Sequence, residues 1–292
     1  MEAAANLRQG ETRCDSMTEQ LAADMRTGET GITLWNPSGV LSAAVAQIRL
    51  PFPVRLEDGP EVQWISCDKE GFVGLMNLDP IPPFGCRIFH PGEKVSMAAP
   101  QIAETNVLEN SLWRICFDEN GEIRELYDKS ADRQVLRGRG NVLSAHVDRG
   151  GYFESWNITP DAERKVFILK EVDEMSLVED GPVRKTLRIR KRFRHSVIDQ
   201  HISIYEKLPR IDFRTKADFR EQQMLLKAGF QVDVDAPAAT YDISMGNIKR
   251  PTTRNTSFEK AMFEVCMHKF MDLSSDDYGV AILNDCKYGG DV

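Results

Sequence analysis

The feature of this sequence that most constrains its fold is a long succession of short β-prone runs, separated by clusters of Pro, Gly and Asp, with few amphipathic helical stretches between them. Clusters of this kind mark tight turns between strands. Successive parallel strands would need long, usually helical, crossover connections. The pattern therefore predicts a mainly β protein whose antiparallel sheets stack as sandwiches.

Two groups of runs predict two β domains. The first group holds runs at 31–37, 45–50 and 62–67, followed by a turn-rich stretch at 79–85 and one last strand. The weakly patterned residues 97–105 are expected to form a linker. In the second group, runs at 112–117 and 123–127 flank Asp118-Glu-Asn-Gly121, which favours a β-hairpin. Further strands are expected at 166–169, 183–193, 197–205, 211–217, 228–234, 240–245, 262–265 and 280–283.

A short helix is predicted near the start of the chain. Residues 16–27 end before Gly28, and Ser16 is followed three positions later by Glu19, which is the spacing of a capping box. The predicted organisation is a helical segment at 1–27, a small β-sandwich domain at 28–100 and a large antiparallel β-sandwich domain at 101–292.

Charge and cysteine content restrict the partners and the compartment. The 292 residues carry 37 Lys and Arg against 45 Asp and Glu, and the formal net charge of −8 repels phosphate backbones and anionic lipid. No run has the apolar length of a membrane span, and no signal layout opens the chain. The six cysteines include no CxxC pair, so we expect reduced thiols. These features predict a cytoplasmic protein that binds neither nucleic acid nor membrane.

One stretch is locally basic. Between residues 184 and 194, Leu187, Ile189, Lys191 and Phe193 alternate with Arg188, Arg190, Arg192 and Arg194. Side chains two positions apart share one face of a strand, so the pattern predicts a strand with one wet face. A solvated face that discourages edge pairing is the preferred interpretation. A patch for an anionic ligand is the alternative.

Several unusual strings occur in a fixed order from residue 106 onward. They include Phe117-Asp-Glu-Asn-Gly-Glu-Ile-Arg-Glu-Leu-Tyr-Asp-Lys129, Glu179-Asp-Gly-Pro-Val-Arg184, Leu208-Pro-Arg-Ile-Asp-Phe213, Leu225-Leu-Lys-Ala228 and Asp277-Tyr-Gly-Val-Ala-Ile-Leu-Asn-Asp-Cys-Lys-Tyr-Gly289. In this order they resemble the C-terminal β-sandwich region of cytosolic-type α-mannosidases of glycoside hydrolase family 38. Leu34-Trp-Asn-Pro37 and Pro82-Pro-Phe-Gly85 resemble, more loosely, the small β domain of the same family.

The resemblance implies a fold and an activity. The fold is a galactose-mutarotase-like supersandwich preceded by a small β domain, with residues 1–27 as the last helix of a middle domain. The activity is that of a retaining, zinc-dependent glycoside hydrolase that removes terminal α-linked mannose from oligosaccharides or glycans. In the family, the reacting carboxylates and the zinc ligands belong to a preceding catalytic domain. The resemblance therefore implies a fragment cut at both ends, with no catalytic residue, metal site or cofactor of its own, and inactive alone.

Two strings depart from the family pattern. Tyr152-Phe-Glu-Ser-Trp-Asn157 stands where the family has a Trp-Asp-Ala-Trp-Asp-like string, and Phe219-Arg-Glu221 stands where it has a Trp-His-Glu-like string. Altered substrate preference is the expected consequence. Tyr152 and Trp156 could form a sugar-stacking platform, although packing in the core is the preferred interpretation.

A polar cluster near the end of the sequence is the candidate site. Asn284-Asp-Cys-Lys-Tyr-Gly289 directly follows an apolar run, and polar groups at strand ends are where sites are commonly built. In the intact enzyme we expect Lys287 and Tyr288 to donate hydrogen bonds to sugar hydroxyls and Asp285 to orient Lys287. The alternative is a turn that only caps the sandwich and buries Tyr288.

One motif imitates a metal site. His146-Val-Asp148 has the His-x-Asp form of the family's first zinc-ligand pair, but residues 140–145 match a strand of the non-catalytic region. Two further ligands are not apparent nearby, so we expect no zinc here. For the whole chain, a stand-alone carbohydrate-binding β-sandwich module remains the alternative. The expected partners are a mannose-containing oligosaccharide and the chain's own catalytic domain, while linkage preference and oligomeric state stay open.

Overall fold

The computed structural model describes residues 16–17, 20, 31–40, 45–97, 102–150 and 157–292. The chain divides into two compact units, Met1–Met97 and Ala98–Val292. The helix predicted over 16–27 lies outside the described residues, except for three helical positions, Ser16, Met17 and Gln20. Tyr152 and Trp156 also lie outside them. Within the described ranges, no helix is long and apolar enough to cross a membrane.

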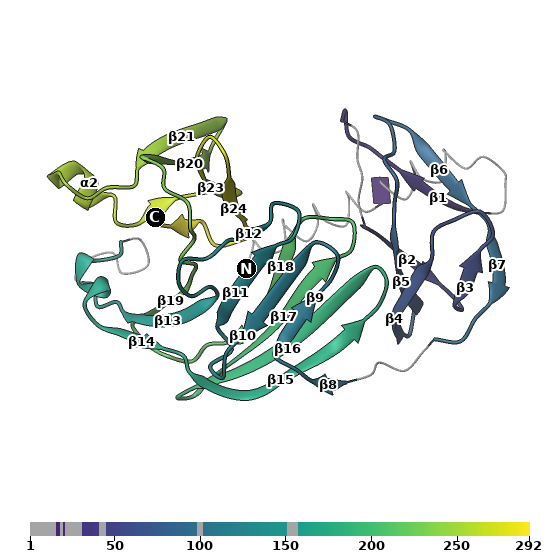
Figure 1. Ribbon diagram of the computed structural model, residues 1–292, viewed down its shortest axis with the longest axis horizontal. Coiled ribbons are helices and arrows are strands. Elements are labelled where there is room, and N and C mark those ends of the chain that lie inside the picture. The colour runs from purple at the N-terminus through teal and green to yellow at the C-terminus, as the bar shows by residue number, and fades with distance from the viewer. Residues whose placement is uncertain (1–15, 18–19, 21–30, 41–44, 98–101, 151–156) are drawn as a thin grey trace. The chain divides into compact units, whose positions relative to one another are not determined.

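The first unit consists of small antiparallel sheets (Figure 1). Its strands are β1 (Ile32–Trp35), β2 (Val45–Leu50), β3 (Val54–Leu56), β4 (Val62–Asp68), β5 (Gly71–Asn77), β6 (Cys86–Phe89) and β7 (Pro91–Lys94). They pair as β1 with β6, as a sheet in the order β2-β5-β4, and as β3 with β7. One core joins all three sheets, and its buried members are Ile48, Val54, Leu56, Met76 and Phe89.

Strand β5 lies at the centre of its sheet and was not predicted. Its middle residues are buried without alternation, so the period-2 signal of a half-exposed strand is missing. Its glycines also resemble turn signals, although Gly74 has a packing role. A Cβ at Gly74 would lie 2.5 Å from Val62 Cγ1, so only glycine leaves room for the neighbouring strand. The single strand expected after 79–85 was also wrong, because β6 and β7 are separate strands.

The second unit is again built from antiparallel strands in its described part (Figure 1). The first of them are β8 (Ala103–Glu104), β9 (Val107–Glu109), β10 (Trp113–Phe117), β11 (Ile123–Asp128), β12 (Arg133–Gln134), β13 (Val142–Val147), β14 (Val166–Ile168), β15 (Glu171–Asp180), β16 (Arg184–Phe193), β17 (Ser196–Tyr205) and β18 (Ile211–Asp218). Then follow β19 (Met224–Gly229), β20 (Ala238–Ile243), β21 (Gly246–Pro251), β22 (Val265–Cys266), β23 (Phe270–Ser274), β24 (Gly279–Leu283) and β25 (Gly289–Gly290). A 3₁₀ turn, η1 (Pro160–Glu163), and one short helix, α2 (Ser257–Ala261), complete the described elements.

Two sheets of this unit share one hydrophobic core and so form a sandwich. Their strand orders are β12-β11-β10-β9 and β18-β17-β16-β15-β8, and Figure 1 shows the first lying over the second. The buried residues between them come from β9, β10, β11, β16 and β17 and the loop after β12, and they are Leu108, Ile115, Phe117, Ile123, Leu126, Val135, Leu136, Leu187, Ile189, Ile202 and Ile204. The predicted mainly β, antiparallel sandwich class is confirmed.

The remaining sheets have the orders β14-β13-β19, β21-β20-β23-β24 and β22-β25. The predicted hairpin β10–β11 is present, and Asp118 fixes its turn. Its carboxylate Oδ1 accepts the N–H groups of Asn120 and Glu122, each at 3.0 Å. Gly121 adopts φ +66°, a left-handed conformation that glycine reaches without a Cβ clash.

Several sequence predictions in this unit need correction, and β21 and β23 were not predicted. Strand β15 was missed because its sequence is rich in acids, which face the arginines of β16 and hide the apolar alternation. The expected linker contributes β8, which pairs with β15. The strand predicted at 228–234 lies instead at β19 and ends at Gly229. Most of 262–265 is the turn after α2, a helix that a Thr256–Glu259 capping box begins.

Candidate functional site

The predicted cluster at 284–289 forms the loop between β24 and β25, and both ends of this loop are fixed. At its start, the Asn284 N–H donates to the Lys269 carbonyl at 2.9 Å. At its end, the Tyr288 carbonyl accepts the Met267 N–H at 2.7 Å. The supporting segment is held in turn by Asp242 of β20, which accepts from the backbone N–H groups of His268 and Lys269. The loop is therefore fixed by main-chain hydrogen bonds at both ends.

The tip of the loop points its polar groups to solvent. Asp285, Cys286 and Lys287 are exposed, and Lys287 has φ +80°, in the left-handed region that non-glycine residues rarely adopt. Tyr288 is 56% exposed, with its ring edge-on against His268 at a centroid distance of 5.7 Å. Tyr288 is therefore not buried, contrary to one part of the capping alternative. A turn that only caps the sandwich remains the alternative to a binding loop. Among the contacts of the described residues, Asp285 and Lys287 share no hydrogen bond or ion pair.

A charged triad lies beneath the end of the loop, and the sequence did not predict it. Lys227 Nζ on β19 lies 2.7 Å from Glu264 Oε2, just before β22, and 2.7 Å from Asp291 Oδ2, just after β25. Burial disfavours the ammonium, but the hydrogen bonds to Asp291 and Glu264 outweigh it and raise the Lys227 pKa. Because the partners are 37 and 64 residues away in sequence, no local pattern could have identified the triad.

His146 is held by two intramolecular contacts. Its Nδ1 lies 3.0 Å from the Ala162 carbonyl and its Nε2 lies 2.9 Å from Ser144 Oγ. Both ring nitrogens therefore have protein partners, and Asp148 makes no hydrogen bond through its buried Oδ1. In the part of the chain that the structure describes, no three His, Cys, Asp or Glu side chains gather as metal ligands.

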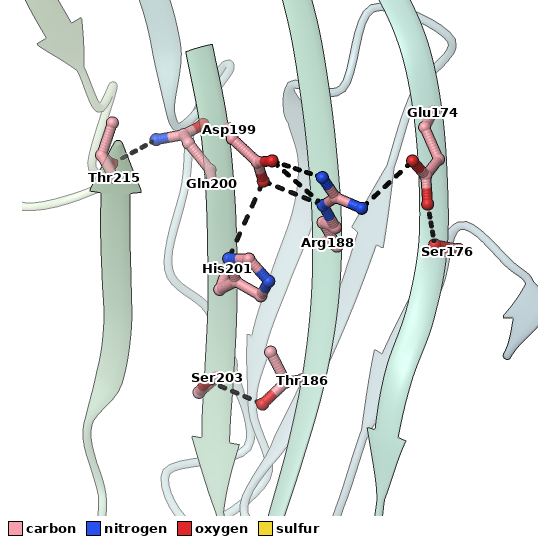
Figure 2. A network of polar contacts seen from close by, with 9 residues as sticks. All are labelled: Glu174, Ser176, Thr186, Arg188, Asp199, Gln200, His201, Ser203 and Thr215. Atoms are coloured by element: carbon pink, nitrogen blue, oxygen red, sulfur yellow. Dashed lines mark hydrogen bonds and ion pairs between the residues drawn. The ribbon is translucent and has the colours of Figure 1, made fainter. Parts of the chain in front are cut away.

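The arginine-rich strand β16 faces acids on both neighbouring strands (Figure 2). Arg188 donates from Nε to both Asp199 carboxylate oxygens at 3.0 and 3.2 Å, and from Nη1 to Glu174 at 3.3 Å. Arg184 pairs with Glu179 and Arg192 with Asp173 in the same way. Acidic neighbours within the sheet thus largely neutralise the basic run. This favours the interpretation as a solvated strand face over a patch for an anionic ligand.

The opposite face of β16 carries a buried lysine. Lys191 is 0% exposed, and its Nζ makes a single long hydrogen bond of 3.4 Å to the Leu169 carbonyl. Burial lowers the Lys191 pKa to about 8, although the nearby Glu122 and Asp118 carboxylates oppose this shift. The sequence placed Lys191 on the apolar face of the strand but gave no sign that its charged end stays inside.

Comparisons with known proteins agree with one another. Residues 108–292 match the family described as glycosyl hydrolases family 38 C-terminal domain. The chain is 33% identical over 191 residues to alpha-mannosidase G of Dictyostelium discoideum and 27% identical over 243 residues to alpha-mannosidase 2C1 of Homo sapiens. These alignments cover 63% and 79% of this chain, but only 18% and 23% of the relatives.

A solved structure supports the fold. The crystal structure of an alpha-mannosidase from Enterococcus faecalis V583 superimposes with a TM-score of 0.69 and 16% sequence identity. The likeness covers 94% of this chain and 40% of that chain. The architecture described above is therefore one that also occurs within a much longer polypeptide.

Proposed function

Because the chain belongs to glycosyl hydrolase family 38 through the C-terminal domain of that family, we propose that it is the non-catalytic β region of an α-mannosidase. The observation that carries the proposal is the match over 108–292, together with two relatives that are both named α-mannosidases. In the intact enzyme, the substrate is a glycan or oligosaccharide with terminal α-linked mannose. The bond is cleaved with retention in a separate catalytic domain.

Zinc would belong to that catalytic domain and not to this chain. The described residues do not fit a zinc site, because His146 is engaged through both ring nitrogens and no three potential ligands converge. What this chain supplies is a rigid frame. The sandwich fixes β24 and its neighbours, and these strands present the loop at 284–289 to the substrate cleft.

In this loop, Lys287 and Tyr288 are the proposed hydrogen-bond donors to sugar hydroxyls. The support is their exposure on a backbone that main-chain hydrogen bonds fix at both ends. A backbone that is fixed before the substrate arrives reduces the conformational entropy that the loop loses on binding. Asp285 stands on the same exposed tip, so we propose that it contacts substrate directly or through water.

We also propose a cytoplasmic location. Support comes from the cysteines: in the described residues, Cys67, Cys86, Cys116, Cys266 and Cys286 are all free thiols. Unpaired thiols are typical of a reducing compartment.

The test is hydrolysis of 4-nitrophenyl α-mannoside. The full-length protein that contains this chain is expected to turn the substrate over, whereas residues 1–292 alone are expected to give no more product than a buffer blank. A preparation from host cells that carry an empty vector controls for contaminating glycosidase. An inactive full-length protein, or turnover by residues 1–292 alone, would refute the proposal.

A further inference from the structure

We propose that Lys227 is the positioning residue of the loop at 284–289: its ammonium holds the returning end of the loop and so sets where Lys287 and Tyr288 point. The kinetic consequence rests on the proposed function. The mechanical consequence concerns this chain alone and can be measured without substrate.

Lys227 links two sheets. Lys227 lies on β19, in the sheet β14-β13-β19, whereas the loop belongs to β24 and β25. The ammonium contacts Asp291, directly after β25, and Glu264, directly before β22, both at 2.7 Å. One side chain therefore joins the two strands of the β22–β25 pair to a different sheet.

The returning end of the loop packs closely against the segment that Lys227 holds. Gly289 lies against Glu264, since a Cβ at Gly289 would come within 2.8 Å of Glu264 Oε1. Gly290 is equally close to Met267, where a Cβ would lie 2.8 Å from the sulfur. The carboxylate that Lys227 holds is thus the surface on which the end of the loop rests. Moving it changes the path of the backbone that leads back to Tyr288.

The Lys227 ammonium separates two carboxylates that would otherwise repel each other. The side chains of Lys227, Glu264 and Asp291 are only 23%, 13% and 31% exposed, so water screens their charges weakly. Without the ammonium, two carboxylates that contact the same nitrogen would face each other and repel. The resulting displacement would fall on residues 289–291. The Lys227 pKa is raised, so the ammonium keeps its charge at neutral pH.

The control is a lysine of the same chemistry elsewhere in the unit. Lys129 Nζ lies 2.7 Å from Glu109 Oε1, and its side chain is 32% exposed, but none of its contacts involves the loop. Lys129→Met should lower thermal stability about as much as Lys227→Met does. Only Lys227→Met should affect the loop.

Hydrogen exchange of residues 1–292 gives the mechanical readout. Lys227→Met is expected to speed amide exchange at 265–267 and 288–291 at least about tenfold, with no local change in Lys129→Met. Lys227→Arg should restore part of the protection because it keeps the charge. Asp291→Asn serves as a milder variant if Lys227→Met folds poorly, and it should speed amide exchange at residues 288–291. Unchanged exchange in both variants would overturn the positioning role.

Kinetics of the full-length enzyme give the second readout. Lys227→Met should lower kcat/KM about tenfold, and it should have no further effect when Lys287→Ala and Tyr288→Phe are already present, because it acts through these two donors of the loop. Equal losses in both backgrounds would overturn the proposal. If exchange responds as expected but the wild-type protein hydrolyses no mannoside, the positioning role stands and the proposed function fails.

Discussion

The five-stranded sheet and the sheet that carries the loop use polar residues in opposite ways. On β15, β16 and β17, charged side chains pair across strands, as Arg188 does with Asp199 and Glu174 (Figure 2). The opposite face of β16 and β17 is core, with Leu187 and Ile202 fully buried. The described part of the sheet β21-β20-β23-β24, by contrast, has a small core, in which Ala239 and Tyr241 of β20 pack with Met267 from the segment before β23.

The contrast shows where binding can reside. A polar group that is already paired within a sheet gains little from a ligand, because binding must first break the existing pair. The tip residues Asp285 and Lys287 have no such partners among the described residues, and they stand on a fixed backbone. We therefore propose that the five-stranded sheet supplies stability and that the thinner sheet supplies the contact groups.

The largest expected difference between the two sheets comes from the same substitution made in each. Leu187→Ala removes a fully buried side chain and should cost about 2–5 kcal/mol of unfolding free energy. Leu283→Ala, at a leucine that is 69% exposed, should change it by less than about 0.5 kcal/mol. Urea unfolding of both variants measures the difference. Similar costs would mean that the thinner sheet is as tightly packed as the sandwich.

The pH dependence of stability offers the next test. Folding lowers the Lys191 pKa to about 8, whereas an unfolded lysine titrates near 10.4. Between these values the unfolded chain binds more protons, so the unfolding free energy rises with pH, by up to about 3 kcal/mol from this group. Below pH 8 the buried charge remains a cost.

The measurement is denaturant unfolding at several pH values between 7 and 10.5. Lys191→Met should lack the rise that Lys191 contributes, so its stability relative to wild type should decline over this range. Lys249→Met, at an exposed lysine of β21, is the matched control and should leave the pH dependence unchanged. Parallel curves for wild type and Lys191→Met would show that the Lys191 amine reaches water.

A smaller effect separates paired from exposed charges within the five-stranded sheet. The Arg188 hydrogen bond lowers the Asp199 pKa, so Asp199→Asn should cost about 1–2 kcal/mol at pH 7. This stabilisation is present above the unfolded pKa of about 3.9 and is lost as pH falls through the lowered folded value. Asp218→Asn, whose partner Arg220 is exposed, should hardly change stability. Chemical unfolding at pH 7 and pH 3 measures both, and equal costs would contradict the contrast.

How much of this the sequence could predict varied with the strength of local patterns. Strand β16 was placed correctly because apolar and basic residues alternate along it. Strands β2 and β17 were placed correctly because they are β-prone runs bounded by turn signals. Strands β5 and β15 were missed because glycines or acids obscure that alternation, and only the neighbouring strands explain those residues.

The candidate site, too, could be predicted from the sequence only in part. The loop at 284–289 follows β24 directly, so its place at a strand end could be predicted from the chain. The edge-on contact of Tyr288 with His268 and the contact of Lys227 with Asp291 join residues far apart in sequence. A single sequence holds no local signal for such pairs, and the prediction that Asp285 orients Lys287 remains a prediction.

The most direct test of the account replaces Lys287 in the full-length protein, which we propose to be an α-mannosidase. Lys287→Ala should lower kcat/KM tenfold to a hundredfold, as expected for a lost hydrogen bond to a sugar hydroxyl, with the melting temperature nearly unchanged. Lys287→Gly should show the same kinetic loss, and because glycine accepts φ +80° without strain, it should melt no lower than Lys287→Ala. A kcat/KM within twofold of wild type, together with a lowered melting temperature, would show that the loop only caps the sandwich.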